Sequence, residues 1–248
     1  MFLSKLKNKK QVVSWSLYDF ANQPFTTIIV TFVYGAFFTK YIVADEHTGT
    51  LLWSSAIAIT AIVVSILSPI FGALADKGGY RKFFLILFTW TCSIFSILLY
   101  FPDVGDVYFA LSLFIVANIS FELGSVFCNS YLPDLTQQDN IGKVSGFAWG
   151  LGFVGGLSAL FLSLYLFPDL NPEGIKRINI LVGVWFLVFS IPTFLFVTDR
   201  KGEKLQRRHI IDSFKSLKNT FNEVIKYKKT AYFLIARLFY NDGLVTIF

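Results

Sequence analysis

The amino-acid sequence predicts an all-α membrane protein, and three observations lead to that prediction. Of its 248 residues, 54% are hydrophobic and only 15% are charged, whereas soluble domains carry about 25% charged residues. The mean hydropathy is +0.60. The apolar residues also form continuous runs of about 20, which match the ~30 Å hydrocarbon core of a bilayer. Because a membrane barrel would instead show alternating segments of about 10 residues, we expect helices to span the membrane.

Six of these runs are complete, and a seventh begins near residue 231. The six cover approximately residues 14–38, 52–75, 83–101, 107–132, 144–167 and 178–197. We therefore expect a six-helix bundle over residues 1–197, a cytoplasmic linker over 198–230 and the start of a second bundle over 231–248. Since the seventh run stops soon after it starts, we expect a fragment of a longer protein. A six-span protein with a short tail is the alternative.

The linker contains apolar residues at helical spacing. Ile210, Phe214, Leu217, Phe221 and Val224 recur along one side of a helix. This pattern predicts an amphipathic helix at the membrane surface. A solvated helix that packs against its own bundle fits the pattern equally well. In both cases the linker separates two membrane bundles.

Lysine and arginine are distributed unevenly among the loops. Eighteen lie in the N-terminus and in the loops after the second, fourth and sixth runs, and three lie on the other side. Basic residues concentrate on the cytoplasmic side of membrane proteins, so we expect the N-terminus in the cytoplasm. These loops account for the net charge of +6. No nucleic-acid-binding motif accompanies that charge, so no nucleic acid partner is expected.

The loop after the second run has a defined pattern of glycine, aspartate and basic residues. From Gly72 to Lys82 it reads GALADKGGYRK. Gly79 allows a tight turn, and Gly72 allows close approach of another helix. Asp76 can accept hydrogen bonds from Arg81 or from a facing helix N-terminus. The pattern matches, at every defined position, the signature between spans 2 and 3 of the major facilitator superfamily. The chain therefore resembles that superfamily, in which this loop latches the cytoplasmic gate.

Four further segments narrow the resemblance to one branch. They are SWSLYDFAN at 14–22, LPD at 132–134, SGFAWGLG at 145–152 and ARLFYNDG at 236–243. They are similar to segments of the vacuole-effluxer-like branch, which includes autophagy-related amino-acid effluxers and their bacterial relatives. The resemblance implies a twelve-span protein, of which a C-terminal half is missing here. It also implies amino acids as solutes.

Polar and charged residues inside the runs are the candidates for a solute or ion pathway, because such residues are costly within a bilayer. Asp19 and Asn22 share a face of the first run. The fourth run has a polar stripe that should face the bundle interior. The stripe consists of Asn118, Glu122, Ser125 and Asn129. Glu122, a carboxylate in the middle of its run, is the first candidate for proton coupling or for binding a substrate amine. A structural carboxylate between helices is the alternative.

Two more candidates, Arg237 and Asp242, lie in the seventh run and are expected to face the same pathway. Asp19 and Asp242 are both near the ends of their runs. A role at the membrane surface or in gating is therefore as well supported for them as contact with the solute. The fourth run has no arginine, although many superfamily members carry one there. The usual coupling scheme is therefore not expected to apply.

The fifth run is rich in glycine. Gly146 and Gly150 form one pair, and Gly152 and Gly156 form another, with the spacing of closely packed membrane helices. Gly150 also begins a G-x-G-x-x-G sequence. No strand precedes it, so a dinucleotide site is excluded.

Prolines and cysteines complete the notable residues inside the runs. Pro24, Pro69 and Pro192 lie in or near the first, second and sixth runs and are expected to kink them. Cys92 and Cys128 lack metal-ligand spacing, so we expect them to be small buried residues.

Secondary active transport of a small solute by alternating access is the function that these features favour. H⁺ or another ion is the expected coupling partner, and the bilayer of a bacterial inner membrane is the expected location. A non-transporting scaffold or receptor with the same fold is the alternative. An enzyme is not expected, because His47 and His209, the two histidines, lie in loops on opposite membrane faces. No cofactor or metal is expected.

Overall fold

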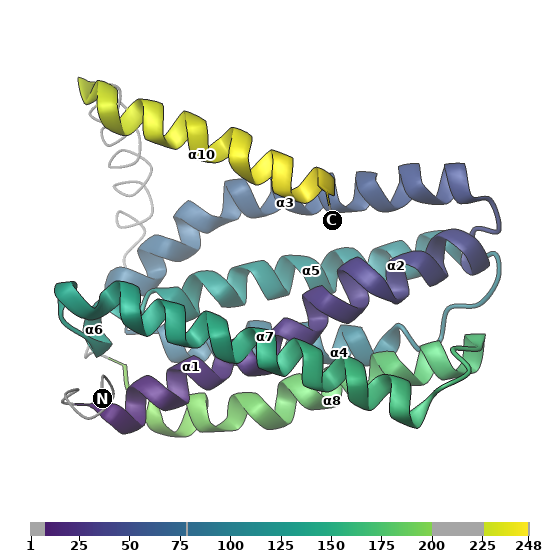
Figure 1. Cartoon of the computed structure of the whole chain (residues 1–248), viewed down its shortest axis with the longest axis horizontal. Coiled ribbons are helices and arrows are strands. Elements are labelled where there is room, and N and C mark those ends of the chain that lie inside the picture. The colour runs from purple at the N-terminus through teal and green to yellow at the C-terminus, as the bar shows by residue number, and fades with distance from the viewer. Residues whose placement is uncertain (1–7, 78, 200–225, 248) are drawn as a thin grey trace. The chain divides into compact units, whose positions relative to one another are not determined.

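The computed structural model describes residues 8–77, 79–199 and 226–247. It divides into two compact units, residues 1–203 and 204–248. The amphipathic helix predicted within the linker lies outside the described residues. All regular elements of the described chain are helical (Figure 1).

The first unit contains six long apolar helices, and each is long enough to cross a bilayer. In order, its helical elements are α1 (Lys9–Pro24), η2 (Phe25–Phe32), α2 (Tyr34–Phe37), η3 (Phe38–Ile42), α3 (Glu46–Lys77), α4 (Arg81–Leu98), α5 (Val107–Asn129), α6 (Leu132–Leu135), η4 (Gln138–Asn140), α7 (Ile141–Leu166) and α8 (Pro172–Phe196). The first span is the continuous stretch from α1 to η3, Lys9–Ile42. The predicted all-α membrane bundle of six spans is therefore confirmed.

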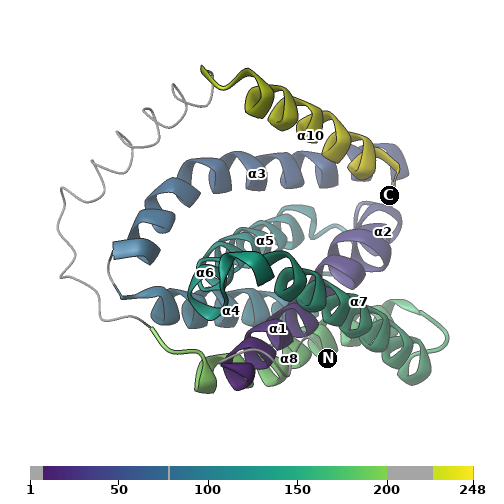
Figure 2. The ribbon, with the colours of Figure 1, turned by 60° about the vertical axis from the view of Figure 1, so that its left-hand side comes forward.

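The contacts that the first three spans make with the last three follow a symmetric pattern. α1 packs against α7 and α8, and α5 packs in the same way against α3 and α4. α4 and α8 pack against each other (Figures 1 and 2). If spans 1, 2 and 3 exchange places with spans 4, 5 and 6 in that order, the pattern of contacts is unchanged. Because each set has an odd number of spans, the two sets cross the membrane in opposite directions, which is the arrangement of inverted repeats.

The first span changes helix type at Pro24. A proline has no N–H, so the carbonyl of Phe20, four residues earlier, loses its usual partner within the helix. The indole Nε1 of Trp185, on α8, donates to this carbonyl over 3.2 Å. The π-helix η2 follows immediately after Pro24. The change of helix type at Pro24 is thus accompanied by a hydrogen bond from another helix, and the predicted kink stays a prediction.

Two glycines of α7 allow it to lie directly on α1. A Cβ on Gly155 would overlap the carbonyl oxygen of Phe20 and lie 2.8 Å from its Cα, and a Cβ on Gly156 would lie 2.8 Å from the Oγ1 of Thr27. A Cβ on Gly152 would make an ordinary contact of 3.4 Å with Asp19. The close approach therefore centres on Gly155.

Three glycines that were predicted to support helix packing make no such contact. A Cβ on Gly72, Gly146 or Gly150 would meet nothing within 4 Å among the described residues. Gly146 and Gly150 precede the part of α7 that crosses α1, so glycine spacing alone did not identify the contact. Gly155, which lies outside the predicted pairs, makes the closest approach.

The second unit contains α10 (Lys228–Ile247). The seventh run was expected to begin near residue 231, and a helix does cover it. α10 is not among the six helices that meet the length and hydropathy of a membrane span, so its crossing of the bilayer stays a prediction. Arg237 is exposed on α10. Asp242 lies on the same helix, and its side chain is outside the described part of the structure.

Candidate functional site

Two aromatic residues of the segment at 14–22 fix the rotation of α1. The indole Nε1 of Trp15 donates to the carbonyl of Cys128 on α5 over 2.8 Å. The hydroxyl of Tyr18 is hydrogen-bonded to that of Thr89 on α4, also at 2.8 Å. Both aromatic side chains are buried. Because successive residues turn by about 100° around a helix, Asp19 lies on a different side of α1 from Tyr18 and on the same side as Trp15, four residues earlier.

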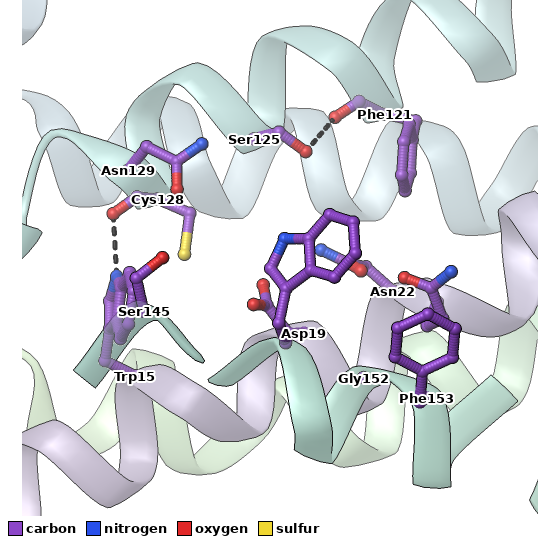
Figure 3. Close-up of a pocket in the computed structure, with 12 residues that line it drawn as sticks. Trp15, Asp19, Asn22, Phe121, Ser125, Cys128, Asn129, Ser145, Gly152 and Phe153 are labelled. Atoms are coloured by element: carbon purple, nitrogen blue, oxygen red, sulfur yellow. Dashed lines mark hydrogen bonds between the residues drawn. The ribbon is translucent and has the colours of Figure 1, made fainter. Parts of the chain in front are cut away.

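That side of α1 borders a cavity of about 240 Å³. Residues of α1, α5 and α7 line it (Figure 3). They are Trp15, Asp19, Asn22, Gln23, Phe121, Ser125, Cys128, Asn129, Ser145, Trp149, Gly152 and Phe153. Ligand pockets for drug-sized molecules typically measure about 300–1,000 Å³, so this cavity is of a size for a small solute.

Polar groups from three helices meet in the cavity, with Ser145 on α7. Asp19 points from α1 into the space that Ser125 and Asn129 border from α5 (Figure 3). Neither the carboxylate of Asp19 nor the side-chain amide of Asn22 has a hydrogen bond or ion pair with another described residue, although Asn22 is only 7% exposed. A buried amide and a carboxylate without protein partners are suited to bind a ligand or water, since unpaired polar groups are costly to bury.

The predicted polar stripe of α5 is divided between two environments. Ser125 and Asn129 line the cavity, and Asn118 is buried elsewhere in the bundle. Glu122 is exposed and does not line the cavity. Its neighbour Phe121 stacks on the ring of Phe25, the first residue of η2, and lines the cavity, so the helical turn of about 100° carries Glu122 away from it.

Sequence reasoning did not propose the aromatic wall of the cavity. Trp149 and Phe153 supply it from α7, with ring centroids 5.7 Å apart in an edge-to-face arrangement. Ser145 and Trp149 do lie in the SGFAWGLG segment. The sequence prediction for that segment concerned only its family resemblance and its glycines. Ser145, Trp149 and Gly152 recur at intervals of about one helical turn, and this spacing could have predicted that they face the same cavity.

Arg81 forms a buried cluster at one end of the bundle. Its side chain is 6% exposed, and its guanidinium donates to Asp134 over 2.8 Å and to the carbonyl of Ser130 over 2.9 Å. Asp199 lies 3.6 Å from its Nε. The hydroxyl of Tyr131 donates to Asp199 over 2.5 Å. One guanidinium thus joins the start of α4, the end of α5 and the segment after α8.

The predicted gating loop takes part in this cluster through its last residues. The backbone N–H of Lys82 donates to Asp199 over 2.9 Å, and its Nζ donates to the carbonyl of Val197 over 3.1 Å. Gly79 has a φ of +61°, a region that favours glycine. The side chain of Asp76, a predicted acceptor for Arg81, lies outside the described residues. Asp134 and Asp199 were not predicted as the carboxylates that bind Arg81.

A second polar network joins the opposite ends of α4 and α8. Lys176, which is mostly buried, pairs with Asp103 at 3.0 Å. Asn179 donates to the carbonyl of Leu99, just beyond the end of α4, over 3.3 Å. The hydrogen bond from Lys176 lowers the pKa of Asp103. α4 and α8 are therefore joined by polar side chains at both ends.

Comparison with known proteins identifies relatives of this chain. A family model described as "Vacuole effluxer Atg22 like" matches residues 41–248. YxiO, named an uncharacterized MFS-type transporter of Bacillus subtilis, is 28% identical over 96% of this chain and 58% of its own. Autophagy-related protein 22-1 of Penicillium rubens is 23% identical over 79% of this chain and 45% of its own. The chain spans about half the length of these relatives. No solved structure matches it with significance.

Proposed function

Because the chain belongs to the family of Atg22-like vacuole effluxers, we propose that it contributes a solute-binding bundle to a secondary active transporter of small solutes such as amino acids. The observation that carries the proposal is the cavity between α1, α5 and α7. A carboxylate and three side-chain amides line it within an apolar bundle, and polar residues at membrane depth are functional candidates because of their cost.

The proposed mechanism is alternating access. The first three and last three spans interlock through the contacts of α1 and α5, so the bundle is proposed to move as one body against the second bundle that the resemblance to the superfamily implies. The cluster around Arg81 lies at one end of α4 and is proposed to hold that end closed in one of the two states. Its ion pairs are shielded from water, so they form and break as a unit. From the distribution of lysine and arginine, we place this end in the cytoplasm.

Coupling to H⁺ or another ion is the remaining part of the proposal. Glu122 stays our candidate, because it is a mid-span carboxylate with no hydrogen bond or ion pair among the described residues. Arg237 and Asp242 stay candidates for the pathway on α10. If Glu122 carries the coupling proton, Glu122→Gln should leave solute flux independent of a pH gradient. Flux that still follows the gradient in this variant would exclude Glu122.

The test of transport is solute flux in proteoliposomes that contain the full-length protein. Labelled amino acids are supplied with and without an imposed pH gradient, and empty liposomes serve as the control. Flux above the control that saturates with concentration supports the proposal. If correctly folded protein carries no member of a broad amino-acid panel and none of a set of organic amines, the protein is not a transporter of small solutes, and the scaffold alternative is favoured.

A further inference from the structure

We propose that the cavity selects a solute with a protonated amine, which Asp19 binds, over neutral or anionic solutes of the same shape. This inference rests on the proposed function, because it names the chemical class that the same cavity takes. It assigns the amine to Asp19 on α1, whereas the sequence favoured Glu122 on α5. Glu122 is exposed and does not line the cavity.

The first step concerns charge. Asp19 is the one carboxylate among the described residues that line the cavity, and no lysine, arginine or histidine accompanies it there. A carboxylate that leaves water without a cation pays a large desolvation cost. A bound ammonium group would offset that cost by a charge-assisted hydrogen bond. An anionic solute would instead add a second negative charge to the same small space.

The second step concerns the other hydrogen-bond partners. An ammonium group has three N–H donors, and one carboxylate does not use them all. Asn22 and Asn129 provide amide oxygens along the same cavity, and Ser125 provides a hydroxyl. The hydroxyl of Ser125 already donates to the carbonyl of Phe121 over 3.1 Å, so its oxygen remains free to accept. The lining thus offers acceptors to a cation beyond Asp19 itself.

The third step concerns the aromatic wall. Trp149 and Phe153 lie in edge-to-face contact, and Phe121 and Trp15 complete the aromatic lining. The faces of aromatic rings attract cations, most strongly for tryptophan. The same rings also accept an apolar body, so the cavity fits a small molecule with one cationic and one apolar end. Its lining, as far as the described residues go, gives no basic side chain to the carboxylate of a zwitterion, so an amine should bind more tightly than the corresponding amino acid.

Four compounds with the same phenyl body test this selectivity on the full-length protein in detergent. They are phenethylamine, L-phenylalanine, 3-phenylpropionate and 2-phenylethanol, and their binding is measured by isothermal titration calorimetry. We expect phenethylamine to bind most tightly and 3-phenylpropionate most weakly. Asp19→Asn should weaken phenethylamine about 10- to 150-fold, the range of a hydrogen bond to a charged group. The same variant should leave 2-phenylethanol unchanged.

Asp139→Asn is the matched control, since Asp139 is exposed on η4, just before α7, and lies outside the cavity. Asp19→Asn that binds phenethylamine as the wild type does would overturn the inference. Equal binding of 3-phenylpropionate and phenethylamine, or no binding of phenethylamine, would overturn it too. If Asp19→Asn does not fold, Asn129→Asp is used instead. Its added negative charge should tighten phenethylamine relative to 2-phenylethanol, and no change would count against the inference.

The two proposals can fail independently. If the flux assay detects transport of other solutes but amines do not bind, the transporter remains and the charge selectivity is wrong. If phenethylamine binds through Asp19 but no solute is carried, the site remains and transport is wrong.

Discussion

Replacing Gly155 by alanine should destabilise the bundle more than the same change at any other glycine of α7. An added Cβ would overlap the carbonyl oxygen of Phe20 and lie 2.8 Å from its Cα, whereas ordinary contacts begin at 3.4 Å. The obstacle is the backbone of α1, which cannot rotate away as a side chain can. To relieve the overlap, α1 and α7 must separate by about 1 Å over their contact, a typical overpacking strain.

The expected cost follows from three contributions. Overpacking of a tight contact costs about 1–3 kcal/mol. Displacing Phe20 also weakens the hydrogen bond that its carbonyl accepts from Trp185, which is worth about 1 kcal/mol. Alanine in place of glycine within a helix returns about 0.5–1 kcal/mol. The net loss in the free energy of unfolding should therefore be about 1–3 kcal/mol.

The assay is unfolding of the full-length protein by SDS in mixed micelles, followed by circular dichroism. Gly150→Ala is the matched control in the same helix, because its Cβ would meet nothing within 4 Å among the described residues. It should be neutral or slightly stabilising. Gly156→Ala should fall between the two, because its nearest obstacle is a threonine side chain that can move. Equal losses for Gly150→Ala and Gly155→Ala would refute the contact between α1 and α7.

Three further substitutions test the ends of α4 and the carbonyl exposed by Pro24, and the same SDS titration serves for all. Arg81→Ala removes the guanidinium that Asp134 and Asp199 share and should cost about 3–5 kcal/mol. A loss below about 1 kcal/mol would contradict the buried ion pairs. Trp185→Phe keeps an aromatic ring but removes the donor to Phe20, so it should cost about 1–3 kcal/mol; a neutral result would show that this hydrogen bond is dispensable. Asp103→Asn should destabilise the protein at pH 7, and the deficit should shrink below about pH 4. The reason is that Lys176 lowers the pKa of Asp103. The ion pair therefore stabilises the folded protein fully above the unfolded-state pKa of Asp103, and this stabilisation is lost as the pH falls through the folded-state pKa. A deficit that is constant from pH 7 to pH 3 would contradict the ion pair.

The membrane spans could be predicted from the sequence because their signal is local. A run of apolar residues has the same meaning whatever it packs against, and the six predicted spans correspond to the six long helices. The irregularity at Pro24 was also local, since it follows from the missing N–H of proline. Its partner, Trp185, could not be predicted, because a hydrogen bond across 165 positions depends on how two helices pack.

The site was predicted only in part for a related reason. The sequence identified Asp19, Asn22 and Asn129 as polar residues within spans, and the structure places all three around one cavity. The sequence ranked Glu122 first, because the number of residues between Glu122 and the ends of its apolar run can be counted. Which side of α5 faces α1 cannot be counted in this way. The contact of Phe121 with Phe25 fixes that rotation, and it turns Glu122 outward.

The partners of Arg81 show the same limit at the end of the bundle. The loop from Gly72 to Lys82 was recognisable as a motif, and Asp76 within it was the predicted hydrogen-bond acceptor for Arg81. Asp134 and Asp199 come from the ends of two other spans. No spacing rule connects them to Arg81, so only the packed bundle reveals the pairing.

The contacts of Arg81 and Lys82 with Asp199 also have a consequence for biosynthesis. The backbone amide of Lys82 finds its acceptor 117 positions later in the chain. A nascent chain that has inserted α4 therefore holds an arginine and a helix N-terminus whose partners have not yet been translated. Because domains form from the N-terminus as the ribosome advances, the first spans must wait in the membrane with this end unfinished. The arrival of Asp199, just after the sixth span, completes the bundle.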